Sequence, residues 1–372
     1  MPGSGGVAHR TQAGLHAGRG RRGFSLAAPL AVALLAAWVI ADPRTPDLAA
    51  QVYRVDLFRR LGFAVWDEHW YAGHHLPGYS LLLPALGSLL GLRLVGVLAV
   101  LASTLLFERL VLEVYGPSAR WAAAFFAVAA VADVWIGRIA FALGVSFALA
   151  AALALARAHP RRGAVLAALC ATASPVAGAL LALGALTHGL ARRSPRAPLA
   201  LAAPAAAVLV PLALLFPEGG FEPFPLRSFL ATVAVVVAFL VALPPGQRTL
   251  RIGAIVYLLA CLASLLVHTP MGSNVERYAV ILAGPLLLCA WGGRLPPRAA
   301  AGLCLITVWV LWGPVRETVA VAGSESTSAG YYQPVERFLA GQGGPARIEV
   351  PLTRSHWEAA LLAPSVSLAR GW

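Results

Sequence analysis

The stretch "VWDEHWYAGHHLPGYS", residues 65–80, concentrates side chains that could do chemistry. It holds His69, His74 and His75 together with paired acids and four large aromatic residues. Adjacent histidines do not share one helical face, and the spacing fixes no acidic third ligand, so a metal site is not predicted. Binding of a sugar on the faces of Trp70 and Tyr71, with the polar His74 and His75 beside them, is one interpretation. An interfacial belt of aromatic residues is the other.

Upstream of this stretch, residues 46–61 carry apolar side chains at helical spacings of three and four. Thr45 and Pro46 supply a helix start, so the sequence predicts an amphipathic helix that lies on the membrane surface. Asp47 falls in its first turn, where it either compensates the helix dipole or acts as a general base. The nearest competing base is Asp42, followed by Asp67 and Glu68.

Further polar residues border later apolar runs. Gln51 and Arg54 occupy the predicted surface helix and are candidate substrate-binding residues; an arginine there either binds a lipid phosphate or contacts headgroups. Arg138 follows Asp133 by five residues at the start of an apolar run, which suits a functional site or a structural ion pair equally. The segment "MGSNVERYAV" places Asn274, Glu276 and Arg277 immediately before another apolar run. Glu276 and Arg277 form either a buried pair or part of a substrate pocket.

The composition indicates the solvent in which these side chains work. Of 372 residues, 59% are hydrophobic and 12% are charged, a balance that excludes an ordinary soluble domain. Long apolar runs recur along the chain, so the sequence predicts an all-α polytopic membrane protein. The formal net charge of +13 comes from arginine clusters between the runs, which favours orientation by the positive-inside rule over nucleic-acid binding. The four cysteines lie within apolar runs and indicate neither disulfides nor a metal site.

About eleven transmembrane helices follow from the apolar runs and from charge parity. Residues 1–24 are expected to form a disordered cytoplasmic tail, and residues 25–313 the transmembrane domain with an outer loop at 42–78. Residues 314–372 are expected outside, with strand-like parts such as "ARIEVPL". Predicted spans are 25–41, 92–112, 121–136, 139–156, 198–216, 228–243, 252–267, 278–292 and 299–313, with two more in a hairpin at 163–190 that turns at 174–178.

The polar candidates all fall on the predicted outer face. The inner loops carry little besides arginine, glycine and proline, and they lack a glycine-rich phosphate loop or acidic metal ligands. The chemistry is therefore expected at the outer surface of the membrane, with the N-terminus cytoplasmic and the C-terminus extracytoplasmic.

An outer loop with an early aspartate leads through the aromatic segment to "HHLPGYSLLLPALG", and "GRIAFALG", "SPVAGALL", "GSNVERYAVILAGPLL" and "HWEAALLAPSVSLARGW" follow in order. In this arrangement the chain resembles the GT-C fold membrane glycosyltransferases. The particular type is that of bacterial membrane proteins labelled 6-pyruvoyl-tetrahydropterin-synthase-related. The resemblance covers about residues 25–372, and the pattern Pro-x-Tyr-x-x-Leu before the second span is part of it.

The resemblance implies transfer of a sugar from a polyprenyl-phosphate donor to a glycan or lipid acceptor at the outer face of a bacterial plasma membrane. Its catalytic base corresponds to Asp47, or alternatively to Asp42. Better-known members have a second acid beside that base, whereas Leu48 follows Asp47 here. In the resembled type the outer segment continues, so a truncation at Trp372 is expected. No cofactor is implied, although a divalent metal is compatible with the chemistry. Alternatives are a transporter or lipid-carrier flippase, and a non-catalytic membrane assembly protein.

Overall fold

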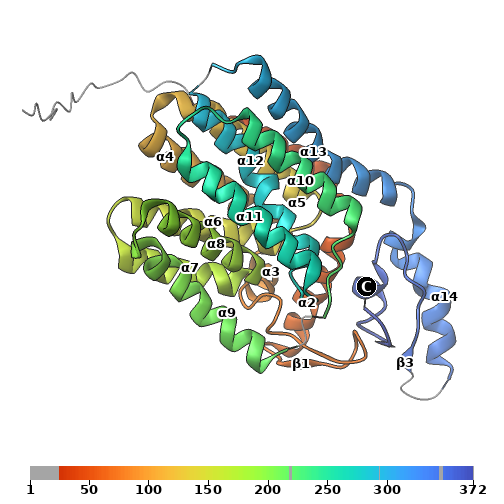
Figure 1. Cartoon of the computed structure of the whole chain (residues 1–372). Coiled ribbons are helices and arrows are strands. Elements are labelled where there is room, and N and C mark those ends of the chain that lie inside the picture. The colour runs from red at the N-terminus through yellow and green to blue at the C-terminus, as the bar shows by residue number, and fades with distance from the viewer. Residues whose placement is uncertain (1–24, 218–219, 293, 343–346, 372) are drawn as a thin grey trace, which may run out of the picture.

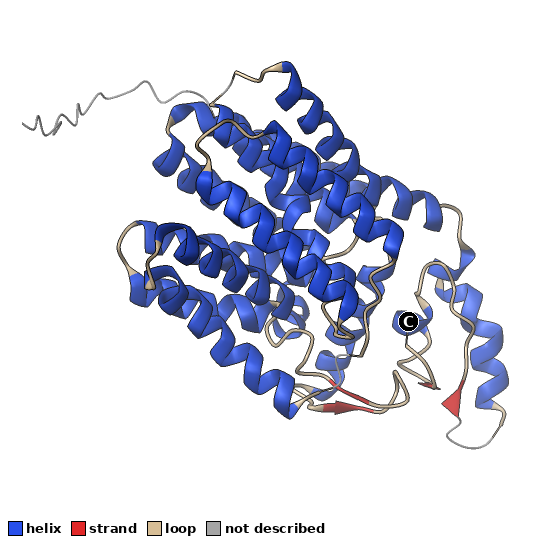
Figure 2. Cartoon of the chain, in the orientation of Figure 1, coloured by secondary structure: helices blue, strands red, loops and turns tan. Residues whose placement is uncertain are grey.

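The computed structural model describes residues 25–217, 220–292, 294–342 and 347–371. The tail predicted at 1–24, and Trp372, lie outside the described residues. Over the described ranges the chain is almost entirely helical, with two short strand pairs (Figure 2). The helices are α1 Ala27–Ala41, α2 Pro46–Leu61, α3 Leu83–Leu90, α4 Leu92–Tyr115, α5 Arg120–Trp135, α6 Ile139–Ala156, α7 Pro160–Ala173, α8 Pro175–Arg192, α9 Ala203–Leu215, α10 Leu226–Ala242, α11 Arg248–Leu266, α12 Glu276–Trp291, α13 Pro297–Val321, α14 Ala329–Ala340 and α15 Glu358–Leu361.

The strands are short and form two separate pairs, one in the outer loop and one in the C-terminal segment. β1, Trp66–Asp67, pairs antiparallel with β2, His74–His75, within the outer loop. β3, Arg347–Ile348, pairs parallel with β4, Ser367–Leu368, in the strand-like part predicted from "ARIEVPL". Both pairs lie at the same lower end of the helical bundle as α14 (Figure 1).

Helices stand at every predicted span, but fewer of them are long and apolar enough to cross a membrane alone. Among the described residues six pass that test, or seven if the bent pair α1 and α2 counts as one span. The six are Leu92–Tyr115, Pro117–Trp135, Ile139–Ala156, Pro198–Leu215, Arg248–Leu266 and Pro297–Val321. The chain is thus an α-helical polytopic protein, whereas the expected total of eleven spans stays a prediction.

The predicted hairpin at 163–190 is present as α7 and α8. The chain breaks at Ser174, which adopts an extended conformation and accepts a hydrogen bond from the backbone N–H of Ala177 at 3.3 Å. Pro175 begins the second helix, where its missing N–H is no loss. The two arms have 14 and 18 residues, so the second arm is longer than the sequence suggested.

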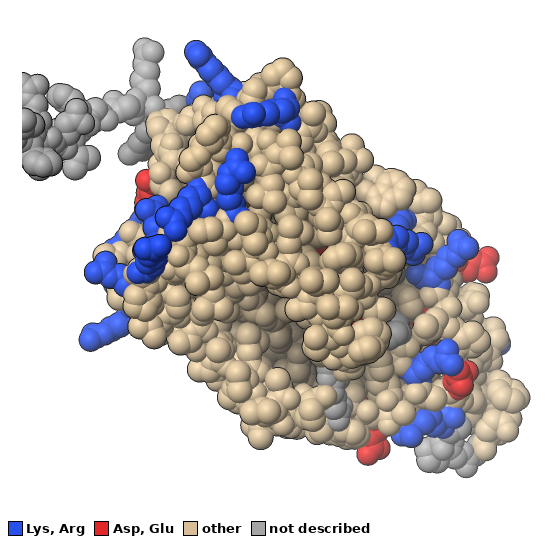
Figure 3. All heavy atoms as spheres, viewed as in Figure 1, with Lys and Arg blue, Asp and Glu red and all other residues tan. Residues whose placement is uncertain are grey.

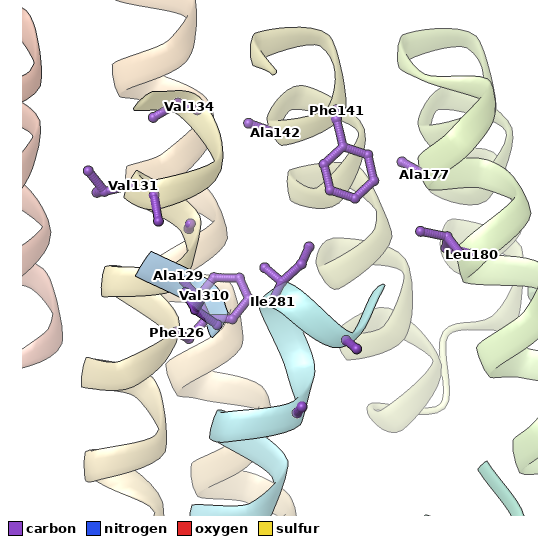
Figure 4. Packing of buried hydrophobic residues seen from close by; sticks show 14 of the residues in the cluster. Phe126, Ala129, Val131, Val134, Phe141, Ala142, Ala177, Leu180, Ile281 and Val310 are labelled. Atoms are coloured by element: carbon purple, nitrogen blue, oxygen red, sulfur yellow. The ribbon is translucent and has the colours of Figure 1, made fainter. Parts of the chain in front are cut away.

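Small residues allow the central helices to approach closely. At Gly144 of α6, an added Cβ would lie 2.6 Å from the Cβ of Ala177 and 2.9 Å from that of Ser174. Figure 4 shows buried side chains of several helices, among them Phe126, Phe141 and Ile281, gathered in one apolar cluster. Such close packing replaces the hydrophobic driving force that is missing between helices in lipid.

Charged side chains differ between the two ends of the bundle. Arginines predominate at one end, whereas arginines and acidic residues lie together near the C-terminal segment (Figure 3). The five connections 116–120, 157–162, 192–198, 243–251 and 292–298 contain no Asp or Glu. This asymmetry is the pattern that the positive-inside rule leads us to expect.

The helix α2 is not simply a surface helix. It turns by 78° from α1 and is covered by the C-terminal segment, because Ala50, Tyr53 and Leu57 pack in one cluster with Tyr332 and Leu362. Gln51, expected on a polar face, is fully buried, whereas Leu61, expected on the apolar face, is 61% exposed. The helix was predicted correctly and its environment was not, because α14 and α15 were not foreseen.

Candidate functional site

Asp47 lies where the first helix gives way to α2. Thr45 is the N-cap of α2 in an extended conformation, and Pro46 follows at the first helical position. These residues fix the direction of the first turn, which carries Asp47. The Asp47 side chain is 37% exposed, so its carboxylate is held by the fold and still reaches solvent.

Arg138 joins Asp47 to a second carboxylate. Its Nε donates to Oδ2 of Asp47 at 3.0 Å, and its Nη1 donates to Oδ1 of Asp133 at 3.3 Å. Asp133 is only 3% exposed and comes from the last turns of α5, whereas Arg138 directly precedes α6. The predicted Arg–Asp pair is therefore present, and it is also part of the cluster around Asp47.

Arg277 approaches the same carboxylate from α12. Its Nη2 stands 3.9 Å from Oδ2 of Asp47, and its guanidinium lies over the ring of Phe141 at 5.3 Å from the centroid. The Arg277 side chain is 15% exposed, and its buried Nε has no hydrogen-bond partner among the described residues. Two guanidinium groups from separate elements therefore orient the Asp47 carboxylate.

The side chains of Asn274 and Glu276, from the same segment "MGSNVERYAV", do not contact Asp47 and have other partners. Glu276 accepts a hydrogen bond from the Thr232 hydroxyl at 3.1 Å, and Asn274 donates to the Pro270 carbonyl at 3.2 Å. Glu276 and Arg277 thus face different partners, so the expected alternative of a buried pair between them is wrong.

Gln51 locks α2 onto the turn before α6. Its side-chain amide donates to the carbonyl oxygens of Asp47 and Gly137, and its Oε1 accepts from the Ala140 N–H at 3.0 Å. Gly137 has φ +96° there, and an added Cβ would lie 2.4 Å from the Leu48 nitrogen. Gln51, predicted to bind substrate, has its amide occupied by backbone partners and instead positions Asp47 beside Arg138.

Tyr79 was missed as a site residue although it belongs to the quoted Pro-x-Tyr-x-x-Leu pattern. Its ring lies 4.5 Å from the guanidinium carbon of Arg54. Burial, followed by the charge of Asp47, raises the pKa of Tyr79 to about 12. Tyr79 therefore stands between Arg54 and the Asp47 cluster as a neutral phenol.

Arg54 borders an open hollow between α2 and the start of α3. The cavity volume is about 30 Å³, or about 400 Å³ when open solvent is included, and Leu57, Phe58, Ser80 and Leu81 also line it. Nη2 of Arg54 lies 3.4 Å from Nε2 of His74, and its Nε is buried without a hydrogen-bond partner among the described residues. The hollow combines one cation with mainly apolar walls.

Asp67 and His74 hold the outer loop together. Asp67 is 3% exposed and accepts a hydrogen bond from the Tyr53 hydroxyl at 2.7 Å and from the His69 N–H at 3.1 Å. His74 is buried beside it, with Nδ1 3.1 Å from the Trp70 carbonyl oxygen. This network is satisfied internally, so Asp67 acts as a structural residue in the loop.

The aromatic residues do not form one open platform. Trp70 is 2% exposed and packs edge-on against Tyr53, so the predicted sugar-binding face of Trp70 is covered. Tyr71 is 38% exposed, and His75 packs against Trp66 and Phe216. Burial of Trp70 follows from the C-terminal segment, whose Tyr332 and Leu368 belong to the same cluster.

Asp42, the alternative base, belongs to a separate pair. It ends α1 in a left-handed conformation and contacts the Arg93 guanidinium of α4. Its side chain is 58% exposed. Asp47, whose carboxylate has arginine partners from two separate elements, is the better oriented of the two carboxylates.

Among the described residues, no three His, Cys, Asp or Glu side chains are placed to hold a metal ion. Comparisons with family models, curated proteins and solved structures give no match to this chain. The resemblance to GT-C glycosyltransferases therefore stays a prediction, and function is argued from the site.

Proposed function

We propose that the chain is an integral membrane glycosyltransferase that moves a sugar from a polyprenyl-phosphate donor to an extracytoplasmic acceptor. The observation that carries this proposal is the partly exposed Asp47 carboxylate, oriented by Arg138 and Arg277 at the end of the bundle opposite the arginine-rich connections. A general base needs such aim, because it must reach a hydroxyl proton at hydrogen-bond distance.

The reaction is a single displacement at the anomeric carbon. The acceptor oxygen forms the new bond to that carbon while the bond to the phosphate oxygen breaks, and the electron pair leaves with the polyprenyl phosphate. Asp47 takes the hydroxyl proton. Attack from the face opposite the leaving group inverts the anomeric centre.

The hollow beside Arg54 suits the donor. A guanidinium recognises phosphate oxygens by parallel hydrogen bonds, and the Arg54 guanidinium is the cation that lines the hollow. The apolar walls formed by Leu57, Phe58 and Leu81 suit the polyprenyl chain. Tyr79 is close both to Arg54, which lines this hollow, and to Asp47. The donor phosphate and the base would therefore lie on either side of Tyr79.

The test is transfer by the purified protein, reconstituted with a panel of labelled polyprenyl-phosphate sugars. Asp47→Asn should abolish transfer, whereas Asp56→Asn should retain it, because Asp56 forms only an exposed pair with Arg60. No transfer from any donor, with substrate flux across the membrane intact, would favour a transporter and reject the proposal.

A second variant tests which of the two carboxylates is the base. Asp42→Asn should keep most activity because Asp42 pairs with Arg93 outside the cluster. If Asp42→Asn abolishes transfer and Asp47→Asn does not, the base is Asp42. If neither change affects transfer, neither carboxylate is the base.

A further inference from the structure

A second hollow opens at the arginine-rich end of the bundle, far along the chain from the Asp47 cluster. It lies between α10, α11 and the start of α13, and it measures about 380 Å³. Its lining is Val237, Leu240, Val241, Leu243, Pro245, Arg251 and Arg298. α12 leads from Arg277, near Asp47, to Trp291 at this end, so the two hollows belong to opposite ends.

Both arginines are positioned by groups that leave their charge uncompensated. Arg251 donates to the carbonyl oxygens of Leu240 and Leu243 at 3.4 and 3.3 Å, at the C-terminal end of α10. Arg298 lies over the Trp291 ring at 5.6 Å from its centroid, and Trp291 is itself fixed by a 2.8 Å hydrogen bond to the Ala242 carbonyl. Among the described residues, neither Arg251 nor Arg298 forms an ion pair.

The wall of the hollow continues onto an exposed apolar helix face. Val237 is 47% exposed and Val241 is 64% exposed, one turn apart on α10. The neighbouring connections 243–251 and 292–298 contain no acidic residue that could neutralise the arginines. A ligand that fits must therefore carry a negative charge at one end and an apolar chain at the other.

We propose that this hollow binds an anionic phospholipid of the inner leaflet. The phosphate lies between the guanidinium groups of Arg251 and Arg298, and an acyl chain runs along Val237 and Val241. Basic pockets between transmembrane helices recognise anionic headgroups in this way, and arginine suits phosphate through its planar set of donors. The proposal does not depend on glycosyl transfer, because none of its residues belongs to the Asp47 cluster.

The test uses the full-length protein in detergent, titrated with phosphatidylglycerol and followed by native mass spectrometry. Phosphatidylglycerol should bind, phosphatidylcholine should bind much more weakly, and inorganic phosphate alone should not reproduce the complex. Changing both arginines, Arg251→Gln with Arg298→Gln, should weaken phosphatidylglycerol binding about 30-fold. Arg298→Gln alone should weaken phosphatidylglycerol binding about fivefold. This single change leaves the carbonyl contacts of Arg251 in place.

A matched control removes the same charge elsewhere at this end. Arg161 and Arg162 are exposed at the start of α7 and do not line the hollow. The double change Arg161→Gln with Arg162→Gln should leave the affinity close to that of the unmodified protein. An equal loss in the two double variants would mean general charge attraction, and equal binding of both lipids would mean that the headgroup charge is not recognised; either result would overturn the proposal.

Discussion

Nε of Arg138 donates a 3.0 Å hydrogen bond to the Asp47 carboxylate, which ties the first turn of α2 to the turn before α6. Arg277 adds a second cation from α12, and Asp133 adds a second carboxylate from α5. Two acids and two arginines thus balance in formal charge. Because four elements supply the four groups, the carboxylate keeps its direction only when the bundle is assembled.

Removing the central cation should destabilise the protein. Arg138→Gln leaves Asp133, which is 3% exposed, without its hydrogen-bonded counter-charge. The loss of one partner of a buried ion pair lowers the free energy of unfolding by about 3–5 kcal/mol. Because the Asp47 side of this cluster is partly exposed to solvent, we expect a loss near the lower end of that range, about 3 kcal/mol. Thermal unfolding in detergent measures the change.

The double variant Arg138→Gln with Asp133→Asn provides the control. Removal of both charges should recover a large part of the lost stability, because no unpaired buried charge remains. A double variant less stable than Arg138→Gln alone would show that Asp133 is stabilised by something other than Arg138. Glycosyl transfer should stay impaired in both, since Asp47 loses its main orienting bond.

Gln51 should be essential for stability without contacting substrate. Gln51→Leu keeps a similar volume but leaves the Gly137 carbonyl and the Ala140 N–H without their side-chain partner. Leaving buried polar groups unsatisfied costs about 1–3 kcal/mol each, so the melting temperature should fall clearly. Gln51→Glu would bury a carboxylate against the Asp47 and Gly137 carbonyl oxygens, so it should cost at least as much stability as Gln51→Leu. A Gln51→Leu variant as stable as the unmodified protein would contradict this account.

The helices and the residues of the cluster were largely predictable from the sequence. Apolar runs and arginine clusters located α1, α4 to α13 and the break at Ser174, because lipid and charge impose strong composition limits. Asp47, Arg138 and Arg277 were identified separately, since polar residues beside apolar runs are costly to keep. Their meeting at one carboxylate was not predictable, because it depends on how distant helices pack.

Other features left weaker signals in the sequence. The helix α14 and the burial of Trp70 arise from the packing of the C-terminal segment on α2, and local periodicity does not report such long-range contacts. Tyr79 was quoted within its motif, but its position beside Arg54 appears only when the loop folds back over α2.

The Tyr79 phenol should ionise late. Burial and the nearby Asp47 charge raise its pKa from 10.0 to about 12, so the fold favours the neutral form. The sign follows from linkage: this contribution to stability is complete below pH 10 and is lost as the pH rises toward 12. The buried Tyr53 and Tyr332 phenols also have raised pKa values, so the ultraviolet titration of tyrosinate should show several late-titrating groups, of which Tyr79→Phe removes one. Tyr331→Phe, at a 49% exposed position, is the control and should leave that group in place.

Gly137 should tolerate no side chain. Its φ of +96° disfavours any residue with a Cβ, and that Cβ would lie 2.4 Å from the backbone nitrogen of Leu48. Gly137→Ala must therefore push the first turn of α2 away from α6 and lengthen the bond between Arg138 and Asp47. We expect a loss of at least about 2 kcal/mol of stability and a fall in transfer. Gly91→Ala is the informative comparison, because Gly91 has φ +81° with nothing within 4 Å of an added Cβ. It carries the backbone strain without the clash, so equal activity losses in the two variants would reject the role of the Gly137–Leu48 contact in aiming Asp47.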